Sequence, residues 1–305
     1  MSSISILGVF VADLAFFAKS IPVAGQTILG ENYVIGPGGK GSNQAVAAAK
    51  AGAKTFFISK IGDDQFVSMA IKIYDEEGVD YSKVVISPDH STGAAGILVD
   101  TESGKNAINV VPGAAGTLTK KDIDNALDII KDSKVFLTQL EAPKDVVFYS
   151  LKIAQQNKIP TILNPAPAAI IDDNLFSLID YFTPNETEAS FYVNYKIENE
   201  SDAKKASQQF LQMGIKNVII TLGEKGAYFA NKEEQFLSPI INLKKPVIDT
   251  TGAGDAFNAG LAVALTEKQN IKEAMRFASV LARLSTTKIG TANSMPYRDE
   301  IDKFL

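Results

Sequence analysis

The stretch of this chain best suited to chemistry is a glycine-rich turn that carries a carboxylate. Residues 249–257 read DTTGAGDAF and lead into a segment that we expect to be a helix, Ala256–Leu265. The small residues of the turn let a ligand approach the backbone closely, and free N–H groups at the start of a helix bind anions. Such a site would stabilise a transferring phosphoryl group while Asp255 removes a proton from the attacking hydroxyl. The alternative interpretation is an aspartate that caps a helix in a glycine-rich turn.

A second glycine-rich stretch, GPGGKGSNQA at residues 36–45, precedes an alanine-rich segment expected to be helical, Val46–Ala51. It contains the dinucleotide-binding pattern G-x-G-x-x-G, which normally follows the first strand directly. Here the first expected strand ends near Gly8, well before this stretch, so the match is weak. Asp63 lies about twenty residues downstream, so a dehydrogenase stays open on spacing alone. A P-loop is excluded, because Ser42 stands where that motif requires lysine.

The same stretch also offers side chains suited to a polyol. Lys40 supplies one cation and Asn43 one amide, next to glycines that permit close approach of a ligand to the backbone. These groups fit hydrogen bonding to sugar hydroxyls better than binding of a pyrophosphate.

Two more polar loops follow expected strands. Residues 185–188, NETE, come after the expected strand Tyr181–Thr183, and their amide and carboxylates suggest Mg²⁺ with its waters near phosphates. The alternative is a helix that begins with acidic residues. Residues 221–226, TLGEKG, could hold nucleotide phosphate or ribose, or could form a hairpin turn into Ala227–Ala230.

Bulk composition limits the functional classes. The 305 residues are 46% hydrophobic and 21% charged, and the net charge is −5. Lys and Arg are scattered and form no basic face, so no nucleic-acid partner is expected. There is no cysteine, and the single histidine, His90, lies in a polar stretch typical of a solvated loop, so a general base must be a carboxylate, Lys or Tyr. The first apolar run, Ile4–Phe10, is too short for a signal peptide or a membrane span, and we expect a cytoplasmic protein without a membrane partner.

Short apolar runs alternate with amphipathic stretches, which predicts an α/β fold with a doubly wound, mostly parallel sheet flanked by helices. The expected strands are Ser3–Leu7, Thr55–Ile61, Val135–Leu140, Thr161–Leu163, Tyr181–Thr183 and Val218–Thr221. The expected helices are Gln65–Glu77, Lys120–Lys131, Lys144–Asn157, Asp202–Met213 and Ile271–Thr286. Such sheets bind ligands at the carboxyl ends of their strands, where we expect Asp13, Glu141, Asn164, Asn185 and Gly223.

Two regions, about 14–36 and about 91–111, break this alternation. They contain β-like pieces without a helix between them, such as Thr92–Val99 and Ala107–Val111. We expect them to pair as a small antiparallel flap, either a lid that excludes water from a site at the strand ends or a plain hairpin decoration. With no internal repeat or long linker, residues 1–305 are predicted to form a single domain with these two excursions.

Five ordered motifs resemble the ribokinase branch of the PfkB-type sugar kinases, and the resemblance covers essentially the whole chain. The motifs are GGKGSNQA (38–45), NPAPA (164–168), TPNETE (183–188), TLGEKG (221–226) and DTTGAGDAF (249–257). The resemblance implies an α/β core with a β-sheet lid, ATP as co-substrate, Mg²⁺, an activating monovalent cation such as K⁺, and a homodimer formed through the lid. It leaves the dehydrogenase as a remote alternative.

The resemblance also implies roles for individual residues, with Asp255 as the catalytic base and Gly252, Ala253 and Gly254 as the anion hole. The implied sugar contacts are Val11, Asp13, Gly39, Lys40, Asn43, Glu141 and Asp255. The implied nucleotide contacts are Asn185, Thr221, Gly223, Gly226 and Gly254, with Glu188 in the Mg²⁺ region. The implied monovalent-cation site comprises Asp249, Thr251, Gly290 and Ser294.

Two positions depart from the family pattern. Val11 stands where ribokinases typically carry an Asn that helps to hold the ribose. A buried hydroxyl without a partner is penalised, so the pocket would favour a sugar that lacks that hydroxyl, and deoxyribokinases also tend to be apolar here. Ser279 stands where many ribokinases carry a His near the adenine, which affects the nucleotide contacts only.

The function expected from these observations is an ATP-dependent kinase for the primary hydroxyl of a pentose, D-ribose at O5 first of all. The alternatives are 2-deoxy-D-ribose as substrate, a nucleoside or other sugar kinase of the same fold, and a sugar-binding regulator that has lost catalysis. The intact Asp255 and its glycines argue against the regulator, and the 38–44 loop favours a free sugar over a nucleoside.

Overall fold

The computed structural model describes residues 2–305. Nine strands form the main sheet in the order β13-β12-β11-β10-β9-β8-β1-β4-β5, and all neighbouring pairs are parallel except β11–β12 and β12–β13. The strands are β1 (Ser3–Leu7), β4 (Lys54–Gly62), β5 (Val79–Ser87), β8 (Val135–Gln139), β9 (Thr161–Asn164), β10 (Tyr181–Phe182), β11 (Asn217–Thr221), β12 (Ala227–Ala230) and β13 (Gln235–Ser238). The expected doubly wound, mostly parallel sheet is confirmed.

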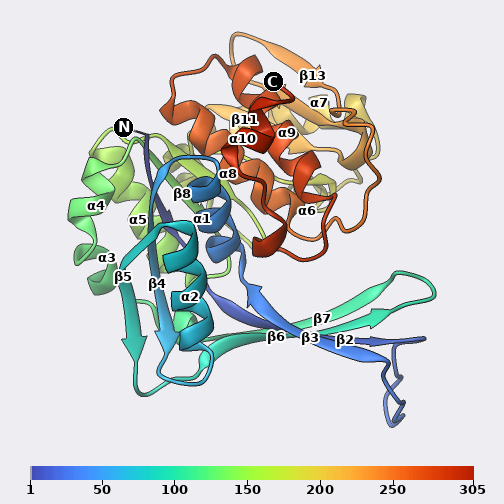
Figure 1. Ribbon diagram of the computed structural model, residues 1–305. Helices are drawn as coiled ribbons and strands as arrows, with labels where there is room; N and C mark the ends of the chain where they lie inside the picture. The colour runs from blue at the N-terminus through green and yellow to red at the C-terminus, as the bar shows by residue number, and fades with distance from the viewer. Residues whose placement is uncertain (1) are drawn as a thin grey trace.

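Helices cover both faces of this sheet (Figure 1). They are α1 (Lys40–Lys50), α2 (Val67–Glu77), α3 (Lys120–Asp124), α4 (Leu127–Asp132), α5 (Lys144–Gln156), α6 (Glu186–Val193), α7 (Glu200–Gln212), α8 (Ala253–Thr266), α9 (Ile271–Ser285) and α10 (Arg298–Asp302). Buried apolar side chains form two clusters, one with α1, α2, α8, α9 and α10 and the other with α3 to α7. Successive strand residues point to opposite faces, so along β8 Val135 and Leu137 join the first cluster while Phe136 joins the second.

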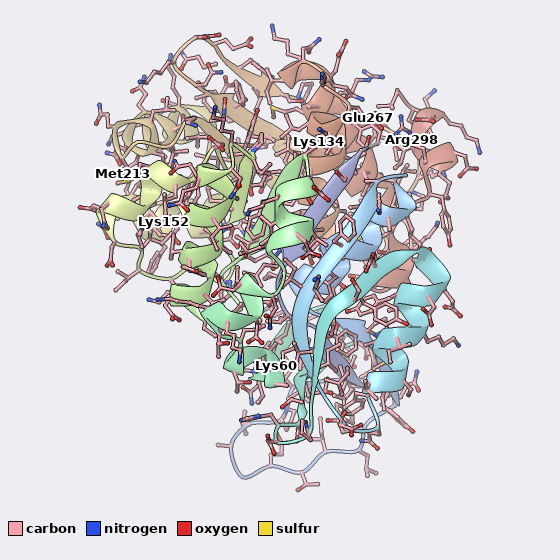
Figure 2. The ribbon with its side chains drawn as sticks, turned by 90° about the vertical axis from the view of Figure 1, so that its left-hand side faces the viewer. Lys60, Lys134, Lys152, Met213, Glu267 and Arg298 are labelled. Carbon is pink, nitrogen blue, oxygen red and sulfur yellow. The ribbon has the colours of Figure 1, made fainter. Side chains whose placement is uncertain are left out.

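The C-terminal helix is fastened to the end of α8 by an ion pair. Arg298 Nη1 donates to Glu267 Oε1 at 2.5 Å, and the two side chains lie beside each other in Figure 2. This contact adds α10 to the layer that packs on the first cluster.

The second sheet, called the lid below, has four strands in the order β3-β2-β6-β7 and reaches away from the core (Figure 1). Its strands are β2 (Val11–Ala18), β3 (Asn32–Gly38), β6 (Thr92–Asp100) and β7 (Asn106–Gly113). The expectation of an antiparallel flap is only half right, because the central pair β2–β6 is parallel. The physical reason is that β2 follows β1 and β6 follows β5, and these parallel strands of the main sheet deliver both lid strands in the same direction.

Other elements differ from their expected bounds. The helix predicted at Lys120–Lys131 is divided into α3 and α4, because Ala126 adopts φ −108° and the carbonyl of Asn125 accepts a hydrogen bond from Lys83 Nζ at 2.8 Å. The helix predicted from Val46 begins at Lys40, so most of the glycine-rich loop is helical. Strands β5 and β13 and helix α10 were not predicted, and His90 lies at an exposed bend as expected. None of the helices within residues 2–305 has the length and apolar character needed to span a membrane.

Candidate active site

Asp255 lies in the first turn of α8 and is 6% exposed. The helix begins at Gly252, whose φ of 78° is the left-handed conformation that glycine adopts without strain. Both carboxylate oxygens accept hydrogen bonds from α1, with Asn43 Nδ2 3.0 Å from Oδ2 and Gln44 Nε2 3.0 Å from Oδ1. The carboxylate is therefore held in one orientation by side chains more than 200 residues away in sequence.

Burial raises the pKa of Asp255, while the Lys40 charge and the amides of Asn43 and Gln44 lower it. A carboxylate with a raised pKa is a stronger base than one in water, provided that it stays ionised at working pH. The Lys40 ammonium and the amide donors of Asn43 and Gln44 stabilise the ionised form of Asp255. The Asp255 side chain bonds to α1 and not to the start of its own helix, so the helix-cap interpretation does not describe it.

A cluster of polar side chains surrounds this carboxylate at the carboxyl end of the sheet. Asp13 lies against the end of β3, because a Cβ atom on Gly38 would lie 2.2 Å from its carboxylate. Glu141 follows β8 and accepts a hydrogen bond from the backbone N–H of Lys40 at 2.9 Å. Gly39, at φ 89°, turns the chain from β3 into α1, where a Cβ atom would lie 2.5 Å from the Val9 carbonyl oxygen.

The carboxylates of this cluster share one cation. Burial raises the pKa of Asp13 to about 6, and the Asp255 charge adds to that rise while Lys40 opposes it. Burial likewise raises the pKa of Glu141 to about 7, opposed by Lys40. Burial alone would lower the pKa of Lys40, but Asp255, Glu141, Glu188 and Asp13 together raise it, so the ammonium stays charged. The cluster combines hydrogen-bond acceptors for hydroxyls with one fixed positive charge.

Val11 lies two residues before Asp13 on β2, so both side chains are on the same face of the lid. It pairs with Gly38 on one side and with Gly93 on the other. Val11 is 3% exposed and joins the second apolar cluster, so the structure offers no polar side chain at this position.

The start of α8 is open to a ligand. A Cβ atom built on Gly254 would meet no atom within 4 Å, and Gly252 caps the helix without a side-chain hydrogen bond. Within residues 2–305, the N–H of Ala253 has the Thr250 carbonyl as acceptor, whereas no acceptor is found for the N–H of Gly254. A free N–H at the N-terminus of a long helix is suited to an anion.

A cavity of about 350 Å³ adjoins this helix start. Its lining includes all five residues predicted to contact a nucleotide: Asn185, Thr221, Gly223, Gly226 and Gly254. Ser279, at the position that departs from the family pattern, also lines it. The sequence reasoning missed the apolar wall formed by Ile240, Val247 and Phe257, which would suit a flat aromatic base.

Asn185 and Glu188 are tied to each other at the start of α6. Asn185 Oδ1 accepts from the Glu188 N–H at 2.8 Å, and Glu188 Oε2 accepts from the Asn185 N–H at 2.9 Å. The helix-cap interpretation of this motif therefore describes its local structure. Burial raises the pKa of Glu188, while the Asn185 N–H and the Lys40 charge lower it and the Asp255 charge adds to the rise.

Three of the four residues predicted for a monovalent cation meet beside the turn before α8. Asp249 Oδ1 accepts from the Thr251 N–H at 2.9 Å, and Oδ2 accepts from the Gly290 N–H at 3.0 Å. The hydroxyl of Ser294 instead donates to the Thr291 carbonyl at 2.8 Å. Among the described residues, no group of three or more His, Cys, Asp or Glu could hold a metal ion by itself.

Sequence reasoning also missed a buried network beneath Asp255. Gln139 Nε2 donates to Gln44 Oε1 at 2.6 Å, and Gln44 Nε2 in turn contacts Asn164 Oδ1 at 3.3 Å. The signal was present in the sequence, since Gln139 is an amide within the apolar run that forms β8.

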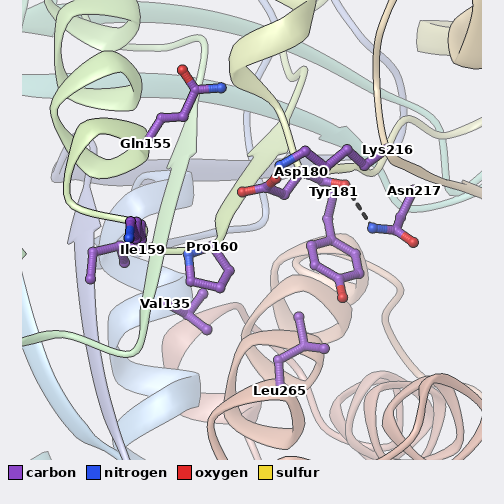
Figure 3. Close-up of a pocket in the computed structure, with 10 residues that line it drawn as sticks. Val135, Gln155, Ile159, Pro160, Asp180, Tyr181, Lys216, Asn217 and Leu265 are labelled. Atoms are coloured by element: carbon purple, nitrogen blue, oxygen red, sulfur yellow. Dashed lines mark hydrogen bonds and ion pairs between the residues drawn. The ribbon is translucent and has the colours of Figure 1, made fainter.

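A larger cavity, of about 480 Å³, lies at the opposite end of the sheet (Figure 3). It is bordered by the first residues of the parallel strands β8, β10 and β11, including Val135, Tyr181 and Asn217. None of the predicted site residues lines it, and its Lys216 is paired with Asp180. The candidate active site is therefore at the carboxyl end.

Comparison with known proteins finds relatives and similar structures over nearly the whole chain. A family model described as pfkB family carbohydrate kinase matches residues 1–298. A ribokinase of Haemophilus influenzae is 39% identical over 99% of this chain and 98% of its own length. A deoxyribokinase of Salmonella typhi is 32% identical over 99% of this chain and 98% of its own. The structure of Arabidopsis thaliana ribokinase complexed with ribose and ATP has a TM-score of 0.92 and 30% identity, and covers 100% of this chain and 99% of that one.

Proposed function

Since the chain belongs to the pfkB family of carbohydrate kinases, we propose that it transfers the γ-phosphoryl group of ATP to the primary hydroxyl of a pentose, D-ribose at O5 first of all. The observation that carries the proposal is that the polar cluster and the nucleotide cavity meet at the first turn of α8. Asp255 belongs to the cluster through Asn43, and the preceding residue, Gly254, lines the cavity. A hydroxyl acceptor and a triphosphate donor bound on the two sides would bring their reacting atoms together there.

The chemistry follows from the two sides of this turn. Asp255 takes the proton of the sugar hydroxyl while the hydroxyl oxygen forms a bond to the γ-phosphorus of ATP. The bond between the γ-phosphorus and the bridging oxygen breaks, and ADP leaves with that oxygen. The free N–H at Gly254 and the ammonium of Lys40 stabilise the charge on the transferring group. Asp13, Asn43 and Glu141 orient the sugar through its remaining hydroxyls.

We include Mg²⁺ and K⁺ in this proposal because the donor sets fit them. Mg²⁺ is usually held by one or two carboxylates, water and substrate phosphates, and Glu188 has one carboxylate oxygen left for that purpose. Asp249, fixed by the N–H groups of Thr251 and Gly290, would hold the monovalent cation. When bound, these ions neutralise phosphate charge and stiffen the turn before α8.

A second substrate, 2-deoxy-D-ribose, is favoured by one observation. Val11 is apolar and buried on the lid face that carries Asp13, so it offers no hydrogen bond to a sugar hydroxyl. The test is an ADP-release assay with ribose, 2-deoxyribose, fructose, tagatose and adenosine. Turnover of pentoses above the other compounds supports the proposal, and preferred turnover of adenosine would refute it.

We further propose that two copies pair through their lids. The lid exposes apolar side chains, with Phe16 46%, Tyr33 63% and Ile108 52% exposed, which is costly on a monomer. The mass measured by light scattering after size-exclusion chromatography decides between a dimer and a monomer, and Tyr33→Glu should shift a dimer toward monomer. ATP is the donor, so we place the reaction in the cytoplasm.

A further inference from the structure

Two consecutive residues of α1 hold the base, and the proposed function uses only one of them. Asn43 belongs to the sugar cluster, whereas Gln44 is fully buried, so its side chain serves the interior rather than the ligand. Gln44 nonetheless donates to Asp255 Oδ1 at 3.0 Å. The Gln44 amide is neutral and buried, so its orientation toward Asp255 must be fixed by its other hydrogen-bond partners.

The charge on Asp255 determines the direction of the whole hydrogen-bond chain. An ionised carboxylate only accepts hydrogen bonds, so Gln44 must present its NH₂ group to it. The carbonyl oxygen of Gln44 then faces away and needs a donor, which Gln139 Nε2 supplies at 2.6 Å. With Gln139 as observed, a reversed Gln44 would place its oxygen against the Asp255 carboxylate and its NH₂ against the NH₂ of Gln139, so the observed direction suits the ionised base.

The second hydrogen of the Gln44 amide supports the same direction. Gln44 Nε2 also contacts Asn164 Oδ1 at 3.3 Å, and Asn164 Nδ2 donates to the Thr183 carbonyl at 3.4 Å. Both hydrogens of Gln44 thus meet acceptors, and its one carbonyl meets a donor. The side chain is fully satisfied in this orientation alone.

The chain ends at an unsatisfied atom. Gln139 is 1% exposed, and its Oε1 has no hydrogen-bond partner within residues 2–305. A Cβ atom on Gly8 would lie 2.3 Å from this oxygen, so a glycine is needed beside it. A buried acceptor without a protein partner is destabilising, and here it accompanies the hydrogen bond that Gln139 donates to Gln44.

We propose that Gln139 and Gln44 are positioning residues that act in series to hold Asp255 ionised and aimed at the acceptor hydroxyl. The unsatisfied oxygen of Gln139 is then the consequence of directing its NH₂ group toward the base. This inference rests on the role of Asp255 in the proposed function. The orientation of Asp255 then depends on Gln139, which donates to Gln44 and not to Asp255 itself.

The expected signature is a shift in the acidic limb of the kcat–pH profile. Loss of a donor disfavours the ionised form of Asp255, so its pKa rises and the limb moves to higher pH. Four charged groups face Asp255 from other elements: Lys40, Asp13, Glu141 and Glu188. Because Asp13 and Glu141, with pKa values raised to about 6 and about 7, also titrate, kcat under saturating sugar is the parameter to measure, and the shift between variants is the result that matters.

The experiment compares Gln44→Met, Gln139→Met and the double variant, since methionine keeps the length of glutamine without a donor. We expect each single change to move the acidic limb up by about half to one pH unit, the equivalent of one hydrogen bond. On the acidic limb, kcat at a fixed pH should fall about three- to tenfold, while the KM for sugar changes less than twofold. Because the two residues act in series, the double variant should match Gln44→Met instead of adding the two effects.

The matched control is Thr138→Val, a neighbouring residue of β8 that is equally buried and points to the opposite face of the sheet. It should leave the limb unchanged. A Gln139→Met profile like that of the control, or additive effects in the double variant, would overturn the relay. If Gln139→Met does not fold, the Gln44→Met profile and ¹³C NMR titration of the Asp255 carboxyl test the same shift. Retained activity in Asp255→Asn would show that Asp255 is not the base and would refute the proposed mechanism. A failure of the relay alone would leave Asp255→Asn inactive, so the two failures are distinguishable.

Discussion

Replacing Val11 by Asn tests how this site chooses between sugars. Val11 is 3% exposed, lies on the lid face that carries Asp13, and is opposed by glycines on both neighbouring strands, Gly38 and Gly93. The space beside it is tight, since a Cβ atom on Gly93 would lie 2.9 Å from Val11 Cγ1. Asn is close to Val in size, so it fits the space and adds one donor and one acceptor.

The expected magnitude follows from this burial. One hydrogen bond to an uncharged hydroxyl contributes roughly 0.5–1.5 kcal/mol, so the ratio of kcat/KM for ribose to that for 2-deoxyribose should rise about two- to tenfold. In the free enzyme the new amide is buried in an apolar cluster without a partner, which should lower the free energy of unfolding by about 1–3 kcal/mol. Bound ribose should restore part of the lost free energy of unfolding, because its hydroxyl pairs with the new amide. Bound 2-deoxyribose lacks that hydroxyl and should restore less.

The assay is ADP release over a range of both sugars, with thermal unfolding of each protein measured with and without sugar. Val11→Ala is the matched control, because it removes the methyl groups without adding a polar atom and should leave the sugar ratio unchanged. An unchanged ratio in Val11→Asn, together with a loss of stability that ribose does not restore, would show that Val11 only packs in the core. The argument for sugar choice would then be wrong.

Three further predictions concern the base, the cation and the sugar carboxylates. Asp255→Asn should lower kcat by at least about 10²–10⁴-fold while sugar binding measured by calorimetry largely survives; retention of more than a tenth of kcat would exclude Asp255 as the base. Turnover should be faster in K⁺ than in Na⁺, because Asp249 lies next to the anion-binding turn, and equal rates in K⁺ and tetramethylammonium would contradict this. Asp13 and Glu141 have pKa values raised to about 6 and about 7, so their protonated forms favour the folded enzyme; the stability they contribute is present at low pH and is lost as pH rises through 6 to 7. The melting temperature without sugar should therefore fall from pH 5 to pH 8 relative to an Asp13→Asn variant, and parallel curves would refute the prediction.

The strands of the main sheet were predictable because each buried strand is a short apolar run. β1 begins and ends where expected, and β4 extends the expected strand by one residue at each end. β5 was missed because it lies at the edge of the sheet and several of its residues are exposed, so its sequence lacks a continuous apolar run. The helix start at Lys40 was missed because glycine disfavours helices, yet Gly41 is required there by the close approach of Gly8, 2.6 Å from its built Cβ.

The site was predictable where one motif carries the chemistry and was missed where several segments contribute one residue each. Asp255 and its glycines are contiguous, and the fold needs only to place them at a helix start. The apolar cavity wall combines Ile240, Val247 and Phe257, whose side chains share no periodicity in sequence. The bond from Gln139 to Gln44 joins residues 95 positions apart, and only the packing of α1 on β8 makes it visible.

The strand order has a consequence for how this chain folds as it is synthesised. β1 is made before the other strands of the main sheet, yet in the finished sheet it lies between β4 and β8, and its Ile4 pairs with Val135. At typical translation rates of about 5–20 residues per second, one edge of β1 waits on the order of ten seconds for its neighbour. From β9 to β13, by contrast, each strand pairs with the one made just before it. Exposure of the nascent β1 edge to a chaperone or to another chain is therefore built into the topology.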